Sequence, residues 1–161
     1  MKTTLEEARE KNHDELVDSL QQLLEKNYDA ENGFKKAVSD AKHADLKAYL
    51  KKQAVQRNRF ATELDYEIRE LNETPKENGS ATATLHRAWI DLKTALSSNK
   101  DESILEECIR GEKASVEEYE DVLKNKNIPL QIENILNKQL ADIRMTLSEV
   151  KTLEDLAEYN S

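Results

Sequence analysis

The sequence predicts an all-α protein that folds as an antiparallel four-helix bundle with a short extra helix in its longest connection. Among 161 residues only three Gly and two Pro interrupt the chain, while 35% of the residues are charged and 5% are aromatic. This composition is typical of long helices with solvated outer faces. Apolar residues also recur at the 3.6-residue helical spacing in four long segments.

The first two segments are predicted to form helices over residues 13–41 and 45–73, joined by a turn near His43 and Ala44. Asn12 is predicted to cap the first helix. Residues 1–12 are charged and weakly periodic, so we expect an N-terminal tail or helical extension there, followed by a single four-helix-bundle domain over 13–158. The predicted inward positions of this helix pair are Leu20, Leu24, Asn27, Glu31, Phe34, Val38, Leu46, Leu50, Gln53, Arg57, Phe60, Leu64 and Ile68.

The second half of the chain predicts a short helix and then two more long ones. The short helix covers 81–96 and carries His86 and Trp89. Asp101 is predicted to cap a helix over 102–125, and Pro129 to start one that runs to about residue 157. The predicted inward positions are Leu105, Cys108, Glu112, Ser115 or Val116, Tyr119, Val122, Ile132, Ile135, Gln139, Ile143, Leu147, Val150 and Leu153.

The long connection between the second and third long helices predicts the topology. If each helix pair is a tight antiparallel hairpin, this connection can run the length of the bundle, which is the single-crossover topology of ferritin-like folds. The alternative is a bundle with short loops throughout and the 81–96 helix as an appendage.

Several ordered motifs carry a resemblance to a known family: DAENGFKKA, QRNRFATEL, GS followed by LHRAWIDLK, and ILEECIRGE with a downstream EEY. Over residues 14–153 the chain resembles an uncharacterised bacterial family of four-helix-bundle proteins, a domain of unknown function grouped with the ferritin-like superfamily. The resemblance implies the fold and brings no established activity. The wider superfamily includes diiron carboxylate proteins such as bacterioferritins and rubrerythrins, which raises the question of a metal site.

Five polar residues interrupt the apolar stripes at one level of the predicted bundle: Glu31, Gln53, Arg57, Glu112 and Gln139. A diiron centre takes Glu from two helices and a Glu-x-x-His pair from each of the other two, and the inward positions here supply no such pair. Arg57 cannot be deprotonated and brings the positive charge that a metal would bring. We therefore expect Arg57 to pair with Glu31 and to reach Glu112, with the glutamines satisfying the remaining polar atoms.

The alternative for this layer is an iron or manganese site. Its ligands are expected to be Glu31 and Glu112, with an additional carboxylate such as Glu63 or Glu107. Cys108 lies one turn before Glu112, and its predicted role is that of a small buried hydrophobe.

The net charge and the sequence motifs argue against several classes of function. The net charge of −9 argues against unspecific binding to nucleic acid or to an anionic membrane surface. There is no apolar signal segment, and a single cysteine fits a reducing compartment, so a cytoplasmic protein is expected. No Ser-His-Asp set, Cys-His set or Gly-rich phosphate loop is present.

The predicted function is non-catalytic, with a structural, stress-associated or protein-interaction role and no cofactor. A protein partner is expected, which includes a second copy of the chain. The alternative is a divergent diiron or dimanganese carboxylate protein, and whether the chain is an enzyme stays open.

Overall fold

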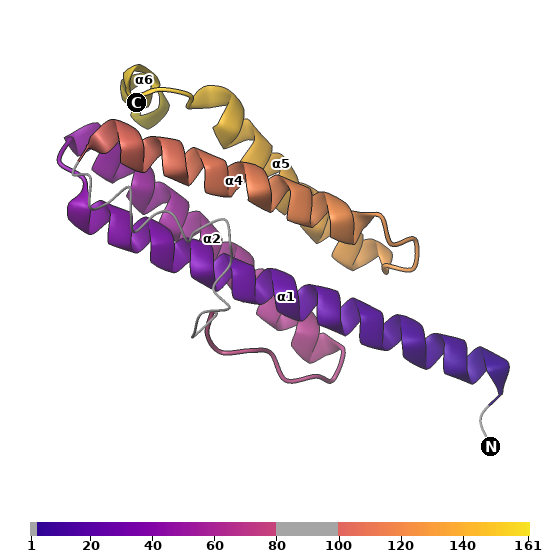
Figure 1. The fold of residues 1–161 in the computed structure, drawn as a ribbon. Helices are drawn as coiled ribbons and strands as arrows, with labels where there is room; N and C mark the ends of the chain where they lie inside the picture. The colour runs from indigo at the N-terminus through magenta and orange to yellow at the C-terminus, as the bar shows by residue number, and fades with distance from the viewer. Residues whose placement is uncertain (1–2, 80–99) are drawn as a thin grey trace.

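The computed structural model describes residues 3–79 and 100–161, and within those ranges the chain forms helices and no strands (Figure 1). The helices are α1 (Thr4–Asp40), α2 (Ala44–Glu70), α4 (Asp101–Leu123), α5 (Leu130–Glu149), a 3-10 turn (Leu153–Asp155) and α6 (Leu156–Asn160). The predicted all-α class is confirmed. The predicted helix over 81–96, with His86 and Trp89, lies outside the described residues.

The helix α1 begins well before the predicted start. Thr3 and Glu6 form a capping box, in which the Glu6 N–H donates to Thr3 Oγ1 at 3.1 Å and the Thr3 N–H donates to Glu6 Oε2 at 2.9 Å. The predicted cap at Asn12 is wrong because this box starts the helix nine residues earlier. Figure 1 shows the first turns of α1 projecting beyond the other helices.

The helix α2 ends at Glu70, three residues before its predicted end. Asn72 has φ 63°, the left-handed conformation that Asn tolerates and that commonly terminates a helix. The following residues then turn back along α1, where Gln21 Nε2 donates to the Thr74 carbonyl at 2.8 Å and the Lys76 N–H donates to Gln21 Oε1 at 2.9 Å. Gly79 lies so close to Asp29 that a Cβ there would overlap its carboxylate.

The start of α4 is tied to the α1–α2 corner. Asp101 was expected to cap α4, but it is the first residue of that helix. Its two carboxylate oxygens accept the backbone N–H groups of Lys42 at 3.0 Å and His43 at 2.8 Å. Because α2 ends at the opposite end of the hairpin, the two ends of the 71–100 connection lie at opposite ends of α2 (Figure 1).

The predicted fourth long helix stops at Glu149, not near residue 157. Thr152 and Asp155 form a second capping box, in which Asp155 Oδ2 accepts the N–H groups of Lys151 at 2.9 Å and Thr152 at 3.0 Å. This box starts a new turn, which leads into α6. The short helix packs on α2: Leu156 is fully buried, and Asn160 Nδ2 donates to the Asp45 carbonyl at 2.9 Å.

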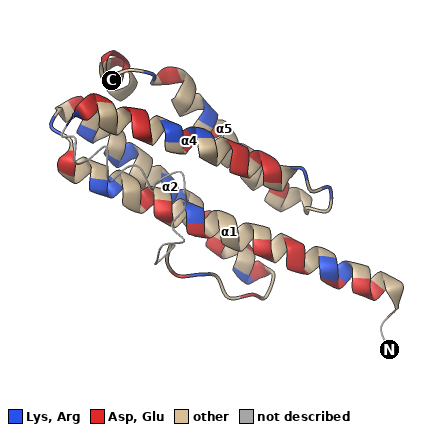
Figure 2. Ribbon diagram, in the orientation of Figure 1, with Lys and Arg blue, Asp and Glu red and all other residues tan. Residues whose placement is uncertain are grey.

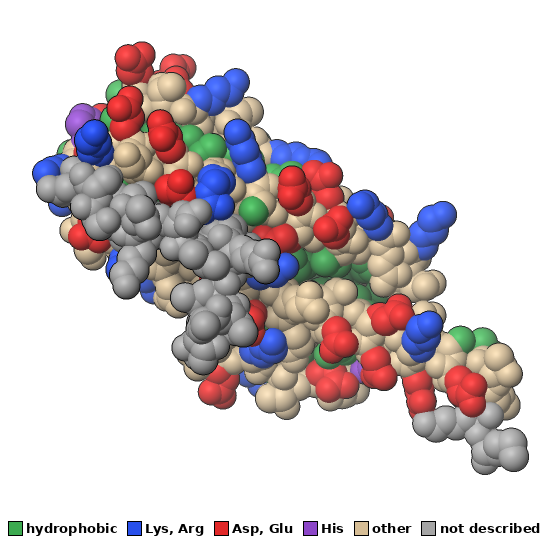
Figure 3. Space-filling model, in the orientation of Figure 1, with side chains coloured by type: hydrophobic (Ala, Val, Ile, Leu, Met, Phe, Trp, Pro, Cys, Tyr) green, Lys and Arg blue, Asp and Glu red, His purple; other side chains and the backbone are tan. Residues whose placement is uncertain are grey.

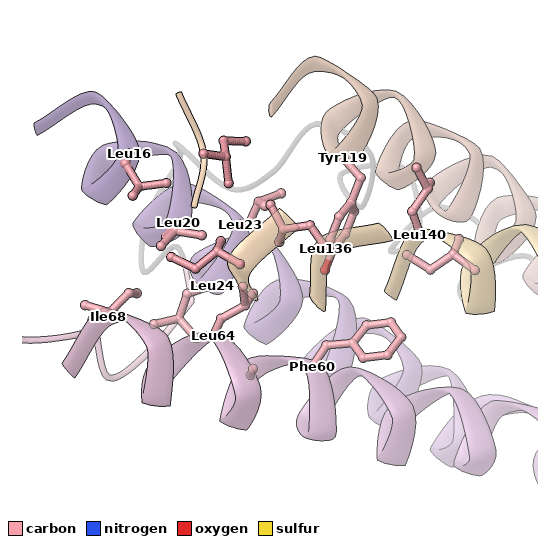
Figure 4. Close-up of a cluster of buried hydrophobic side chains, with 14 residues drawn as sticks. Leu16, Leu20, Leu23, Leu24, Phe60, Leu64, Ile68, Tyr119, Leu136 and Leu140 are labelled. Carbon is pink, nitrogen blue, oxygen red and sulfur yellow. The ribbon is translucent and has the colours of Figure 1, made fainter. Parts of the chain in front are cut away.

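The core has two apolar halves. The corner cluster, near the α1–α2 turn, consists of Ala30, Phe34, Ala37, Ala41, Leu46, Tyr49, Leu50, Ala54, Ile104, Leu105, Cys108, Val150 and Leu156. The far cluster consists of Leu16, Leu20, Leu23, Leu24, Phe60, Ala61, Leu64, Ile68, Tyr119, Ile128, Ile132, Leu136, Leu140 and Ile143, which come from all four long helices and the loop before α5 (Figure 4).

Most predicted inward positions are buried, and two of the exceptions lie on α5. Leu136 and Leu140 are buried there, whereas the predicted Ile135 and Leu147 are only half-buried. Beside the predicted Ile132, Gln139 and Ile143, the buried stripe of α5 therefore also includes Leu136 and Leu140. Val38, Val116, Val122 and Leu153 are also half-buried.

Candidate functional site

A buried polar layer separates the two apolar clusters, and Arg57 lies at its centre. The exposed fraction of Arg57 is 2%, that of Glu112 is 0% and that of Asn27 is 1%. Arg57 Nη2 donates to Glu112 Oε1 at 2.6 Å, and Arg57 Nη1 donates to Asn27 Oδ1 at 2.9 Å. The guanidinium from α2 is thus held by a carboxylate from α4 and an amide from α1. Its charge is balanced by Glu112 inside the protein.

The layer continues from Asn27 to α5. Asn27 Nδ2 donates to the Tyr119 hydroxyl at 2.9 Å, and Tyr119 donates to Gln139 Oε1 at 2.6 Å. Gln139 Nε2 in turn donates to Glu63 Oε1 at 3.1 Å. A single path of hydrogen bonds therefore runs from Glu112 through Arg57 to Glu63, and all four long helices contribute to it.

The predicted pairing of Arg57 with Glu31 is wrong. Glu31 lies one helical turn, about 6 Å, closer to the α1–α2 corner than Asn27. At that level its carboxylate accepts from Lys35 Nζ at 2.7 Å and from Asn58 Nδ2 at 3.2 and 3.3 Å. Asn27, which was predicted only as an inward position, takes the guanidinium instead.

Gln53 also lies outside the Arg57 network. Its Nε2 donates to the Tyr159 hydroxyl at 2.7 Å, and Tyr159 lies in α6, just beyond the predicted end of the fourth long helix. Of the five residues predicted for the layer, the structure therefore joins Arg57, Glu112 and Gln139. Asn27 and Tyr119 complete it, and the sequence signal for both was their place on an inward stripe.

Burial sets the protonation of the hydroxyl and thiol groups near the layer. It raises the pKa of the Tyr119 hydroxyl, an effect that the charge of Arg57 and the hydrogen bond from Asn27 oppose. It also raises the pKa of the Cys108 thiol, and the charge of Glu112 adds to that effect. Cys108 is consequently a protonated thiol at neutral pH, in keeping with the predicted role of a small hydrophobe.

One acceptor in the network is open. Glu112 Oε2 is buried and has no hydrogen-bond partner within residues 3–79 and 100–161. Its sister oxygen carries the 2.6 Å bond to Arg57, so the carboxylate keeps a strong charged partner on one side only.

The four carboxylates predicted as metal ligands are engaged in separate contacts. Glu112 pairs with Arg57, Glu31 with Lys35, and Glu63 accepts from Gln139. Glu107 pairs with Arg110 at 2.8 Å. Among the described residues no group of three or more His, Cys, Asp or Glu is arranged to hold a metal ion. The iron or manganese site stays a prediction, and these contacts do not fit a dinuclear carboxylate centre.

The sequence contains one Glu-x-x-His spacing, formed by Glu10 and His13, and it lies far from the layer. Both residues belong to the first turns of α1, where Glu10 is exposed. His13 Nε2 lies 3.1 Å from Glu73 Oε1, in the segment that follows α2. This pair therefore contributes nothing to the central layer.

No described helix is long and apolar enough to cross a membrane.

Comparison with known proteins shows the family to which the chain belongs. A search of the curated proteins finds no match. The model of the family described as Domain of unknown function (DUF2383) matches residues 15–125, which is 111 of the 161 residues. The match includes the Asn27, Arg57, Glu112 and Tyr119 part of the layer, and α5 lies beyond it. The chain belongs to the DUF2383 family.

Proposed function

We propose that this chain is a non-catalytic helical module that acts by binding another protein chain. Its fold, in this proposal, is a ferritin-like four-helix bundle whose central layer holds a charged hydrogen-bond network where a diiron protein holds metals. The observation that carries the proposal is the position of Arg57, which is 2% exposed and bonded to Glu112 and Asn27. A guanidinium cannot give up its charge, so it repels a cation placed beside it.

The connectivity supports the ferritin-like part of the proposal. The α1–α2 and α4–α5 hairpins lie side by side, and the 71–100 connection joins opposite ends of the molecule (Figure 1). A single long crossover between two hairpins is the arrangement that ferritin-like folds use.

The network suits a structural task. A shift of any long helix by one turn, about 5.4 Å along its axis, would separate at least one donor from its acceptor. Separating Arg57 from Glu112 would leave two buried charges without a partner, so only one register of the helices satisfies the layer. In this proposal the layer fixes a rigid scaffold, and the outer helix faces are what partners meet.

The visible surface fits a role in polar contacts. On the face in Figure 3, acidic and basic side chains are interspersed over α1 and α4, and the hydrophobic side chains show only as small patches. Such a surface favours partners held by charge complementarity together with a few apolar contacts.

The test is metal content. The apo-protein is exposed anaerobically to Fe(II) or Mn(II), freed of unbound ion and analysed by elemental mass spectrometry. The proposal predicts well below one metal per chain. A value near two per chain, as a dinuclear site requires, that is lost in Glu31→Gln and Glu112→Gln would contradict it and support the diiron or dimanganese alternative.

A further inference from the structure

The outer face of α2 carries a stripe of six exposed residues, called here the outer stripe: Lys51, Val55, Arg59, Thr62, Tyr66 and Glu70. Their spacing of 4, 4, 3, 4 and 4 residues keeps them on one side of a helix. That side lies opposite the buried residues Arg57, Phe60 and Leu64. Val55 is 71% exposed and Tyr66 is 56% exposed, so both side chains are accessible to a partner.

The spacing of the outer stripe is the same in both directions along the helix. Its midpoint falls between residues 60 and 61, so Val55 and Tyr66 are equally far from it, as are Lys51 and Glu70. The charges on the two sides are opposite. Apart from the buried Arg57 and Glu67, residues 44–59 hold four Lys and Arg against one Asp, a formal charge of +3, and residues 60–70 hold three Asp and Glu against one Arg, a formal charge of −2.

The net negative charge of the whole chain hides this segregation of basic and acidic residues. Residues 32–59, around the α1–α2 corner, hold eight Lys and Arg against two Asp, a formal charge of +6, in a chain of net charge −9. Figure 2 shows Lys and Arg on α2 near the corner and mostly Asp and Glu along the projecting start of α1. Within the α1–α2 hairpin, the corner end is therefore the basic end.

We propose that two copies of this chain pair through the outer stripe, with their α2 helices antiparallel about a two-fold axis at its midpoint. Val55 then packs against Tyr66 of the partner subunit, and Lys51 lies opposite Glu70 of the partner subunit. Each contact occurs twice, as two-fold symmetry requires. The inference deepens the proposed function, on which it rests, by naming a second copy as the partner.

Charge complementarity singles out a second copy. A surface that is positive at one end and negative at the other is complementary to itself after a half-turn. Lys51 and Glu70 make no ion pair with any described residue, so both are available. Arg59, beside the midpoint, is held by Asp142 of α5 at 3.1 Å, which fixes the centre of the stripe.

One helix per subunit makes a small interface. Such contacts fall at the low end of specific interfaces, below about 1,200 Å² in total, so the dimer is expected to be weak and concentration-dependent. Its charge pairs are exposed at the edge of the contact, so salt is expected to weaken it.

The experiment reverses the charge of Lys51 or of Glu70 by mutation. Sedimentation velocity then measures the monomer–dimer equilibrium over about a hundredfold range of protein concentration, at low and high salt. The wild-type chain is expected to shift from monomer to dimer with concentration at low salt. Lys51→Glu alone and Glu70→Lys alone each place like charges opposite one another twice, so each variant is expected to stay monomeric. An equimolar mixture of the two variants restores both attractive contacts and is expected to give a heterodimer.

Two variants with the same charge changes elsewhere serve as controls. Lys113→Glu and Glu106→Lys change exposed residues of α4, and both variants are expected to dimerise like the wild type. A wild-type chain that stays monomeric throughout overturns the inference, and so does a mixture that fails to restore the dimer. Either result, obtained together with the absence of bound metal, overturns the dimer and leaves the proposed function with a different protein partner. Two bound metals per chain overturn the proposed function itself.

Discussion

The corner cluster and the far cluster fill the core between the same four long helices in different ways. Four of the 13 corner residues are Ala, against one of the 14 far residues. The far cluster is filled instead mainly by Leu and Ile from the long helices (Figure 4). The corner half is thus built for close approach of helix backbones, and the far half for interdigitation of large side chains.

The two halves are also closed differently. The corner half receives α6, which brings Leu156 into the cluster and Tyr159 against Tyr49, with ring centroids 5.5 Å apart. The far half receives Ile128, from the loop before α5, and Ile132 from the first turn of α5. The polar layer with Arg57 lies between them, so the helices are held at their middle by charge and at their ends by apolar contacts.

The largest effect is expected at the boundary between the halves. Glu112→Leu leaves Arg57 buried without its carboxylate and should lower the free energy of unfolding by about 3–5 kcal/mol. Glu31→Leu removes a carboxylate whose cation, Lys35, is largely exposed, so the loss should be about 1 kcal/mol or less. Urea unfolding of both variants measures the difference. Equal losses in the two variants would mean that the buried Glu112–Arg57 pair contributes no more to stability than the Glu31–Lys35 pair.

The next effects separate the two halves directly. Leu24→Ala opens a cavity in the far cluster and should cost about 2–5 kcal/mol. Ala37→Leu overfills the corner cluster, where Ala37 is fully buried, and should cost about 1–3 kcal/mol. Thermal and urea unfolding test both. A stabilised Ala37→Leu variant would show that the corner half has unfilled space and would remove the contrast.

A smaller effect is expected at the closure of the corner half. Tyr159→Phe keeps the ring against Tyr49 but removes the hydroxyl that accepts from Gln53. The loss should be about 1–2 kcal/mol, because the buried Gln53 amide then lacks its acceptor. Hydrogen exchange in α6 should accelerate more than exchange in α5. Uniform acceleration would indicate that α6 unfolds only together with the whole protein.

The smallest effect at neutral pH belongs to the buried tyrosines. Burial raises the pKa of Tyr49 and Tyr119 above the ordinary value of 10.0. A raised pKa in the folded state means that deprotonation favours unfolding, so stability is full below pH 10 and falls as the pH rises above it. Urea midpoints from pH 8 to pH 11, with tyrosinate absorbance, test this. Ionisation of all five tyrosines near pH 10 with the helices intact would contradict it.

Periodicity predicted the four long helices and the inward positions of Arg57, Glu112 and Gln139, but not the partners within the polar layer. Glu31 and Asn27 differ by one turn on the same stripe, and only the relative register of α1 and α2 decides which of them meets Arg57. The sequence carries no direct measure of that register.

Local capping signals explain two other differences. The apolar pattern continues through Val150 and Leu153, so periodicity alone extended the last helix past the Thr152 and Asp155 box. The Thr3 and Glu6 box likewise starts α1 in a segment whose apolar periodicity is weak, so periodicity alone favours Asn12. The charge segregation on α2 was present in the sequence, but the net charge of the whole chain concealed it.

The most direct test of the central claim is a double-mutant cycle on Arg57 and Glu112. The free energy of unfolding is measured for Arg57→Leu, Glu112→Leu and the double variant by urea denaturation. The account predicts that the double variant is more stable than either single variant, because each single change leaves one buried charge and the double change leaves none. Additive losses would contradict the account, since they would mean that the two side chains do not depend on each other in the folded protein.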